Sequence, residues 1–305
     1  MPQSLRQTEL IEAQYVGIDT WSDGHILDAL LAGQERAIAA VRRALPAISK
    51  AANAIAERMK VGGSLYYAGA GTSIRVGVQD GSELPATFGI DEAQLGYFIA
   101  GGKSAVFDGM ADKEDSVEDG RAAAQACTLK DALIAIAASG RTPYTIAAAT
   151  EAKARGCLVI SVINVPNSTL GKLADVEIVL QSGAEVIAGS TRMGAGTAQK
   201  AALNLMSTLL GIKLNAVYDG MMIAMRPDNE KLKERAAIIV AQIADVNIER
   251  ARTGLAEAGA IKPAVLLCAG AKSLADATQL LAGTGGNLRL ALSQLHGKQN
   301  QKLQH

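Results

Sequence analysis

Residues 69 to 89 combine two features that could do chemistry. Gly69-Ala-Gly-Thr-Ser73 is a small-residue loop with hydroxyls, and Glu83 follows a short way along a predicted helix. A loop of this kind between a strand and a helix gathers backbone N–H groups and hydroxyls, and the helix dipole favours an anion there. A nearby carboxylate can serve as an acid or a base. The stretch therefore predicts chemistry on a small molecule that carries a phosphate.

Two more loops of this type follow predicted strands, at 138–143 and 189–197. In the first, Thr142 is a suitable N-cap and Pro143 a suitable first helical residue. One such loop is more often a plain turn, but three in one sheet favour a phosphate site. The hydroxyls suit a phosphomonoester held by neutral donors, with charge added by arginine. The candidate phosphate-binding residues are Thr72, Ser73, Ser139, Gly140, Arg141, Thr142 and Arg192.

The familiar nucleotide motifs are incomplete. Ile74 stands where a dinucleotide fingerprint needs its last small residue, and Tyr97 where a P-loop needs its first glycine. Neither NAD nor ATP is indicated. The chain has only 3 histidines, so we expect no His-based metal site.

Composition excludes several function classes. With 30 basic and 30 acidic residues the net charge is zero, which gives no basis for nucleic-acid or anionic-membrane binding. The start lacks a signal-peptide core, and the apolar stretch 201–212 is too short to span a bilayer. The 3 separated cysteines favour free thiols in a reducing cytosol. We therefore expect a cytoplasmic protein.

Alternating strand-like and helix-like segments predict an α/β fold with a parallel, flavodoxin-like three-layer sheet. Ligands of such sheets bind beyond the carboxyl ends of the strands. A chain that is 49% hydrophobic but 3% aromatic suits this architecture. The expected strands are 64–68, 96–100, 132–137, 158–163 and 176–180. The expected helices are 73–83, 104–110, 115–126, 143–155 and 196–214.

Helical segments are expected on both sides of this sheet domain. Apolar residues over 38–59 alternate in steps of three and four, and Pro46 should kink or divide that helix. The helix either packs on its own domain or on a second subunit. From residue 228 the pattern is wholly helical. The predicted parts are an N-terminal arm and helix (1–50), a sheet domain (51–227) and a helical module (228–305).

Five motifs together resemble the N-acetylmuramic acid 6-phosphate etherase family, within the sugar isomerase (SIS) group of phosphosugar-binding domains. The resemblance covers roughly residues 45 to 235, in the family's order, and extends to the C-terminal helical segment. The motifs are GAGTSIRVGVQDGSELPATFG, IAGGKSAV, MADKED, IAASGRTPYTIAA and EVIAGSTRMGAGTAQK.

The resemblance implies cleavage of the lactyl ether of N-acetylmuramic acid 6-phosphate to N-acetylglucosamine 6-phosphate and D-lactate. It places the catalytic carboxylates on Glu83 and Glu114, and it implies a homodimer that binds a phosphorylated amino sugar without a cofactor. The family usually has glycine where Ile74 stands, so we expect Ile74 to narrow the loop. Other departures from the family pattern fall at Leu84, Ala86 and Gly194.

Simpler interpretations remain open for the same residues. Glu83 lies just before Pro85, near the expected end of a helix, where a solvated surface glutamate is common. Glu114 lies in a charged run that is typical of an exposed helix start. Asp80 is either a helix-face partner of Glu83 or a polar surface residue. The alternative functions are a phosphosugar-binding regulator without catalysis and an aldose–ketose isomerase of the same fold.

Overall fold

The computed structural model describes residues 9–108 and 111–302, which form two compact units. The first contains the described residues up to Ser82 together with Glu92–Leu210. The second contains Glu83–Asp91 and the described residues from Gly211 onward. The three-part division expected from the sequence, with boundaries after residues 50 and 227, stays a prediction.

The first unit is built on a parallel sheet in the strand order β2-β1-β3-β4-β5. This is the flavodoxin-like order, which reverses direction between β1 and β3. The strands are β1 (Leu65–Gly69), β2 (Leu95–Ile99), β3 (Ala132–Ala137), β4 (Leu158–Ile163) and β5 (Val176–Val179). Every residue of β3 is buried, as expected of a central strand covered on both faces. The predicted α/β fold and all five predicted strands are confirmed.

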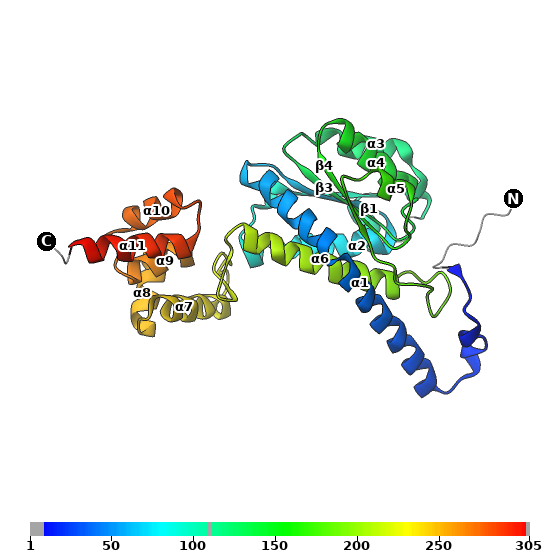
Figure 1. Cartoon of the computed structure of the whole chain (residues 1–305), viewed down its shortest axis with the longest axis horizontal. Coiled ribbons are helices and arrows are strands. Elements are labelled where there is room, and N and C mark those ends of the chain that lie inside the picture. The colour runs from blue at the N-terminus through cyan, green and yellow to red at the C-terminus, as the bar shows by residue number, and fades with distance from the viewer. Residues whose placement is uncertain (1–8, 109–110, 303–305) are drawn as a thin grey trace. The chain divides into compact units, whose positions relative to one another are not determined.

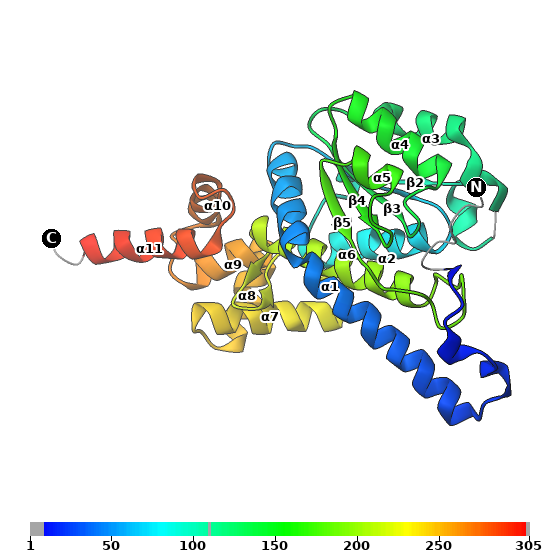
Figure 2. The same ribbon diagram turned by 45° about the vertical axis from the view of Figure 1, so that its right-hand side comes forward.

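Helices cover both faces of this sheet. Figures 1 and 2 show α3, α4 and α5 on one face and α1, α2 and α6 on the other. Their bounds are α1 (Asp23–Lys60), α2 (Gly71–Phe88), α3 (Val117–Ala123), α4 (Pro143–Ala154), α5 (Thr169–Leu173) and α6 (Gly194–Lys213). Short 3-10 turns are η2 (Ala13–Tyr15), η3 (Ile18–Thr20), η4 (Glu92–Gln94), η5 (Lys103–Val106), η6 (Ala111–Asp115) and η7 (Ala124–Ala126).

The helix expected at 104–110 is largely absent. A single 3-10 turn, η5, takes its place, and residues 109–110 lie outside the described part of the chain. Residues 107 and 108, the last ones described before that gap, are not helical. After the gap, η6 carries Glu114, one of the predicted site residues.

Helix α1 runs unbroken through Pro46, so of the two outcomes expected there, a kink or a division, the division is wrong and the kink stays a prediction. Most of the predicted seam packs on its own domain, with Val41, Ile48 and Ile55 buried. Another line of apolar residues on α1 stays in solvent. We call it the outer stripe: Leu27, Leu31, Ile38 and Leu45, which are 64%, 58%, 49% and 42% exposed. At 100° per residue these four side chains fall on one narrow face of the helix.

The second unit is mainly helical, as the sequence predicts. It has its own apolar core, around Val240, Val265 and Leu266. Asn229, Asn247 and Ser273 cap their helices by accepting backbone N–H groups. The elements are β6 (Val217–Tyr218), β7 (Met221–Met222), α7 (Glu230–Ala244), α8 (Ile248–Ala258), α9 (Ile261–Cys268), α10 (Leu274–Gly283) and α11 (Leu288–Lys302).

No helix in the part of the chain that the structure describes has the length and apolar character needed to cross a membrane. The buried thiols of Cys127 and Cys157 and the half-buried thiol of Cys268 are free, as expected.

Candidate active site

Two of the predicted loops leave neighbouring strands at one edge of the sheet. Strands β1 and β3 are paired in parallel, with Gly69 opposite Ile136, so the loops after them begin side by side. The strand order reverses at this point, which is where open parallel sheets bind their ligands. The structure therefore brings together the loop of Thr72 and Ser73 with the loop of Ser139 and Thr142.

The first loop is short because α2 begins almost at the end of β1. Gly71 opens the helix with φ +52°, a backbone conformation that favours glycine. The first N–H groups of a helix have no partner within the helix, so those of Gly71, Thr72 and Ser73 suit an anion. Ser73 is buried and Thr72 half-buried. This loop thus provides backbone donors and two hydroxyls.

Ile74 does not narrow the loop, contrary to the expectation from the sequence. It lies inside the first turn of α2 and is only 1% exposed. Its side chain is directed into the core, where its Cβ lies 3.3 Å from the position that a Cβ on Gly69 would occupy. The backbone there is helical, so isoleucine is accommodated without strain. The departure at Ile74 therefore gives no structural reason against anion binding at this loop.

The second loop, 138–142, is locked in place around Gly140. Gly140 has φ +61°, and a Cβ on it would lie 2.1 Å from Ser168 Oγ, so only glycine fits. The Ser168 hydroxyl is itself engaged, accepting the Gly171 N–H over 3.1 Å. Ser139 Oγ accepts the N–H of Arg141 over 3.2 Å and keeps its own proton to donate. The loop is thus rigid, and its hydroxyl groups retain donor capacity.

Helix α4 begins directly after this loop, and the two threonine hydroxyls at its start make no hydrogen bond that caps the helix or pairs them within the described residues. Thr142 is the N-cap and Pro143 the first helical residue, as predicted, yet the Thr142 hydroxyl makes no cap bond. Thr145, fully buried in the first turn of α4, has an Oγ1 without a hydrogen-bond partner among the described residues. Unpaired buried hydroxyls are costly and usually find a partner. The start of α4 therefore has spare hydrogen-bonding capacity.

The side chain of Glu114, which belongs to η6, lies next to the start of α2. Its Oε1 is 3.0 Å from the position that a Cβ on Gly71 would occupy. Burial is the main cause that raises the pKa of this carboxyl, the charge of Asp115 raises it further, and Arg75 lowers it. A raised pKa suits a carboxyl that transfers protons near neutral pH. In residues 9–108 and 111–302 no three His, Cys, Asp or Glu side chains gather as metal ligands.

Glu83 lies on the same helix but far from this point. It is exposed and follows Gly71 by 12 residues (71 to 83) on α2. At 1.5 Å per residue this places it about 18 Å along the helix axis. Within one chain, then, the two predicted catalytic carboxylates are not brought together.

The third predicted loop has a different character. The buried carboxylate of Glu185 accepts the N–H groups of Gly194 and Ala195, each over 2.9 Å, at the start of α6. Those N–H groups are therefore not available to an external anion. The loop's Arg192 is exposed, as is Arg141. Binding of substrate by either arginine stays a prediction.

Several polar residues at this edge of the sheet were not singled out from the sequence. Asn164, 2% exposed, follows β4, donates to Leu180 O over 3.0 Å and accepts from Gln199 of α6, also over 3.0 Å. Its own N–H donates to Ala138 O over 2.9 Å. A polar residue directly after a buried strand is the signal that could have indicated Asn164. Gln199 and Glu185 carry no such local signal.

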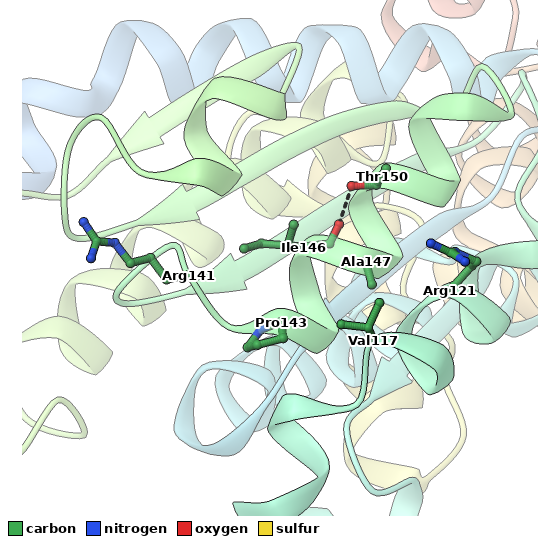
Figure 3. A pocket seen from close by; sticks show the side chains of 7 residues that line it. All are labelled: Val117, Arg121, Arg141, Pro143, Ile146, Ala147 and Thr150. Atoms are coloured by element: carbon green, nitrogen blue, oxygen red, sulfur yellow. Dashed lines mark hydrogen bonds between the residues drawn. The ribbon is translucent and has the colours of Figure 1, made fainter.

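A groove of about 340 Å³ runs along the outer side of α4 (Figure 3). Of the predicted site residues only Arg141 lines it, and Figure 3 shows that side chain pointing away from Arg121. Its walls are mainly apolar: Val117, Pro143, Ile146 and Ala147. None of the predicted hydroxyl donors lines this groove.

Comparison with known proteins decides the family. A sequence from Deinococcus radiodurans named N-acetylmuramic acid 6-phosphate etherase is 37% identical over 292 residues, 95% of this chain and 96% of that protein. One of the same name from Symbiobacterium thermophilum is 46% identical over 236 residues, 76% of this chain and 79% of that protein. The chain belongs to the N-acetylmuramic acid 6-phosphate etherase family. The family resemblance inferred from the five motifs is confirmed.

The domain comparisons agree with the etherase family and its fold. The SIS domain family matches residues 114–209, and the glucokinase regulatory protein N-terminal SIS domain matches residues 47–152. A phosphoheptose isomerase structure from Francisella tularensis is similar in fold. The TM-score is 0.50 and the identity 16%, over 63% of this chain and all of that one. This etherase-family chain thus has the SIS fold in its first unit.

Proposed function

We propose that this chain cleaves the lactyl ether of N-acetylmuramic acid 6-phosphate, giving N-acetylglucosamine 6-phosphate and D-lactate. The observation that carries the proposal is the match to an etherase over 95% of the chain. The paired loops at the switch point of the sheet support it, because they offer hydroxyls and helix N–H groups to a phosphate. The enzyme is a carbon–oxygen lyase that acts in the breakdown of an amino sugar.

The phosphate binds at the two loops after β1 and β3. Thr72 and Ser73 donate from one side, and Ser139, Thr142 and the N–H groups around Gly140 donate from the other. Neutral donors on a rigid loop need little reorganisation when the anion arrives. Arg141 and Arg192 add charge at the rim.

The chemistry then requires one proton acceptor and one donor at each step. In the open-chain sugar a base removes the C2 proton, which the C1 aldehyde makes acidic. The electron pair forms the C2–C3 double bond, and the C3–O bond breaks to release lactate, whose oxygen takes a proton from an acid. Water then adds at C3 and a proton returns to C2. Glu83 is the main acid and base in this scheme, and Glu114 is the second.

A single copy cannot supply both carboxylates to one sugar. From phosphorus to C2 an open-chain hexose phosphate extends about 8 Å, given bonds near 1.5 Å. Glu83 lies about 18 Å along α2 from Gly71, where Glu114 is found. This separation supports an active homodimer in which a second copy contributes Glu83. The outer stripe on α1, with Leu27 and Leu31 largely in solvent, provides apolar surface for that association.

The enzyme works in the cytoplasm. Free thiols at Cys127, Cys157 and Cys268 support this placement, because such thiols persist in a reducing compartment. Phosphosugar recycling from the cell wall would supply the substrate there.

The activity is tested by incubating the protein with N-acetylmuramic acid 6-phosphate and measuring D-lactate. We expect lactate from the wild type and at least about a 100-fold slower release from Glu83→Gln. No lactate from the wild type would contradict the proposed reaction. Unchanged release from Glu83→Gln would contradict only the role of that residue.

Mixed dimers test where Glu83 comes from. The Glu83→Gln and Glu114→Gln variants, each inactive alone, are unfolded together and refolded as a 1:1 mixture. If a second copy supplies Glu83, each mixed dimer has one intact site, and about a quarter of wild-type activity returns. If both carboxylates come from one chain, no activity returns.

A further inference from the structure

A cluster of polar side chains interrupts the aliphatic core beneath α2. Asp80, expected from the sequence at the helix surface, is only 3% exposed. Its Oδ2 accepts the hydroxyl of Tyr67 on β1 over 3.0 Å. Its Oδ1 accepts Asn204 Nδ2 over 2.7 Å and Ser207 Oγ over 2.9 Å, both from α6. One carboxylate thus ties α2 to the sheet and to a second helix.

The face of α2 around Asp80 lies unusually close to the sheet. A Cβ on Gly77 would come within 2.8 Å of Ile136 Cδ1, and one on Gly81 within 2.7 Å of the Tyr97 hydroxyl. Tyr67 and Tyr97 stack beneath these glycines with ring centroids 5.8 Å apart. The two glycines and Asp80 therefore form a flat face on which α2 rests in a single orientation.

The hydrogen-bond directions in this cluster are fixed. Burial, and then the charge of Asp80, raises the pKa of Tyr67 well above its usual value, so the phenol keeps its proton and donates it. A buried carboxylate is tolerated only where donors surround it. With three donors directed at it, the Asp80 carboxylate permits little rotation of α2 about its axis.

We propose that Asp80 is a positioning residue that sets the direction of Glu83, an inference that rests on the proposed etherase reaction. The two residues are three apart on α2, so they are neighbours on the helix surface. Turning the helix to relieve Asp80 would swing the Glu83 carboxylate by the same angle. The backbone N–H groups at the start of α2 lie closer to the helix axis than the Glu83 carboxylate does, and they follow directly after β1. The same rotation of α2 should therefore move them less than it moves the carboxylate.

The test compares Asp80→Asn with a matched variant, Asp131→Asn. Asp131 is also buried, at 5% exposure, and its carboxylate accepts Ser64 N, Thr128 N and Thr128 Oγ1 over 2.7, 2.7 and 2.8 Å. It precedes β3, at the opposite edge of the sheet from the loops. Both variants lower the melting temperature. We expect Asp80→Asn to lower kcat roughly 10- to 100-fold with KM within about 2-fold, and Asp131→Asn to leave both near wild type.

A second variant separates positioning from general damage. Asp80→Asn combined with Asn204→Asp exchanges amide and carboxylate, so the α2–α6 hydrogen bond and the Tyr67 bond can both re-form. We expect kcat to recover by roughly 5-fold or more over the single variant. Wild-type kcat in Asp80→Asn, or equal losses in Asp131→Asn, would overturn the inference. A wild type that releases no lactate would instead overturn the etherase reaction, and the inference with it.

Discussion

The starts of α4 and α6 are similar in sequence but differ in what occupies them. Both follow loops of glycine, serine, threonine and arginine. At α4 the Thr142 hydroxyl makes no cap bond and Thr145 Oγ1 has no partner among the described residues. At α6 the Glu185 carboxylate accepts two N–H groups. The start of α4 therefore keeps unpaired hydroxyls, whereas two N–H groups at the start of α6 are already paired with a carboxylate of the same protein.

The difference also shows in how each loop is held. The 138–142 loop packs tightly on its neighbour where Gly140 meets Ser168, and its Ser139 hydroxyl accepts the Arg141 N–H while keeping a proton to donate. The loop before α6 packs on α1, where a Cβ on Gly33 would lie 2.7 Å from Val186 Cγ2. A similar composition therefore leaves one loop available for the proposed phosphate and gives the other an internal cap.

The largest effect is expected from Gly140→Ala, compared with Gly189→Ala in the loop before α6. Both glycines have positive φ, but only Gly140 is crowded. Gly140→Ala should lower the free energy of unfolding by about 3 kcal/mol and kcat/KM by roughly 100-fold. Gly189→Ala should cost about 1 kcal/mol of strain and leave kinetics near wild type. Denaturant melts and initial rates measure both, and equal effects would break the comparison.

Next in size is the loss of the internal cap. Glu185→Gln should lower the free energy of unfolding by about 2 kcal/mol, because the buried N–H groups of α6 lose a charged acceptor. The matched variant is Glu230→Gln, which removes an exposed glutamate from the first turn of α7. That change should cost less than about 0.5 kcal/mol. If urea melts gave Glu185→Gln wild-type stability, the internal cap would have no energetic role.

A smaller effect should separate binding from stability at α4. Thr142→Ala should raise KM roughly 10-fold, since it removes a donor to the phosphate, while the melting temperature stays nearly constant. Ser273→Ala, which removes a cap that does accept an N–H at α10, should cost about 1 kcal/mol with unchanged KM. A stability loss without a KM change in Thr142→Ala would make α4 an ordinary capped helix.

The smallest expected effect is a shift in pH dependence at the start of α2. Arg75 lowers the pKa of Glu114 and Asp115 raises it. In kcat against pH, the limb that reports Glu114 should therefore move to higher pH in Arg75→Gln and to lower pH in Asp115→Asn. Shifts in the same direction for both variants would show that this limb belongs to another group.

Local sequence signals predicted the sheet and the start of α4 well. The continuous apolar run ALIAIA is β3 to the residue, and Thr142-Pro143 begins α4. These elements depend on neighbours in sequence. Pro46 was expected to kink or divide α1, but the helix is not divided there, since tertiary packing overrides local propensity.

The interior of the site could not be predicted in the same way. Ile74 was expected to narrow the anion loop. That expectation failed because the side chain is buried near Gly69, across the strand–helix turn, a contact that the spacing of residues does not reveal. Glu185 and Asp80 are charged residues that a sequence pattern places on the surface. Both are buried because donors from distant segments surround them. The signal for such residues lies in three-dimensional pairing rather than in spacing.

The central claim is that this chain removes lactate by elimination and then hydrates the sugar at C3. The direct test runs the reaction on N-acetylmuramic acid 6-phosphate in ¹⁸O-labelled water and analyses both products by mass spectrometry. We expect one ¹⁸O at the C3 oxygen of N-acetylglucosamine 6-phosphate, read from a fragment without the exchangeable C1 oxygen, and none in the alcohol oxygen of D-lactate. Label in that lactate oxygen, or no lactate at all, would contradict it.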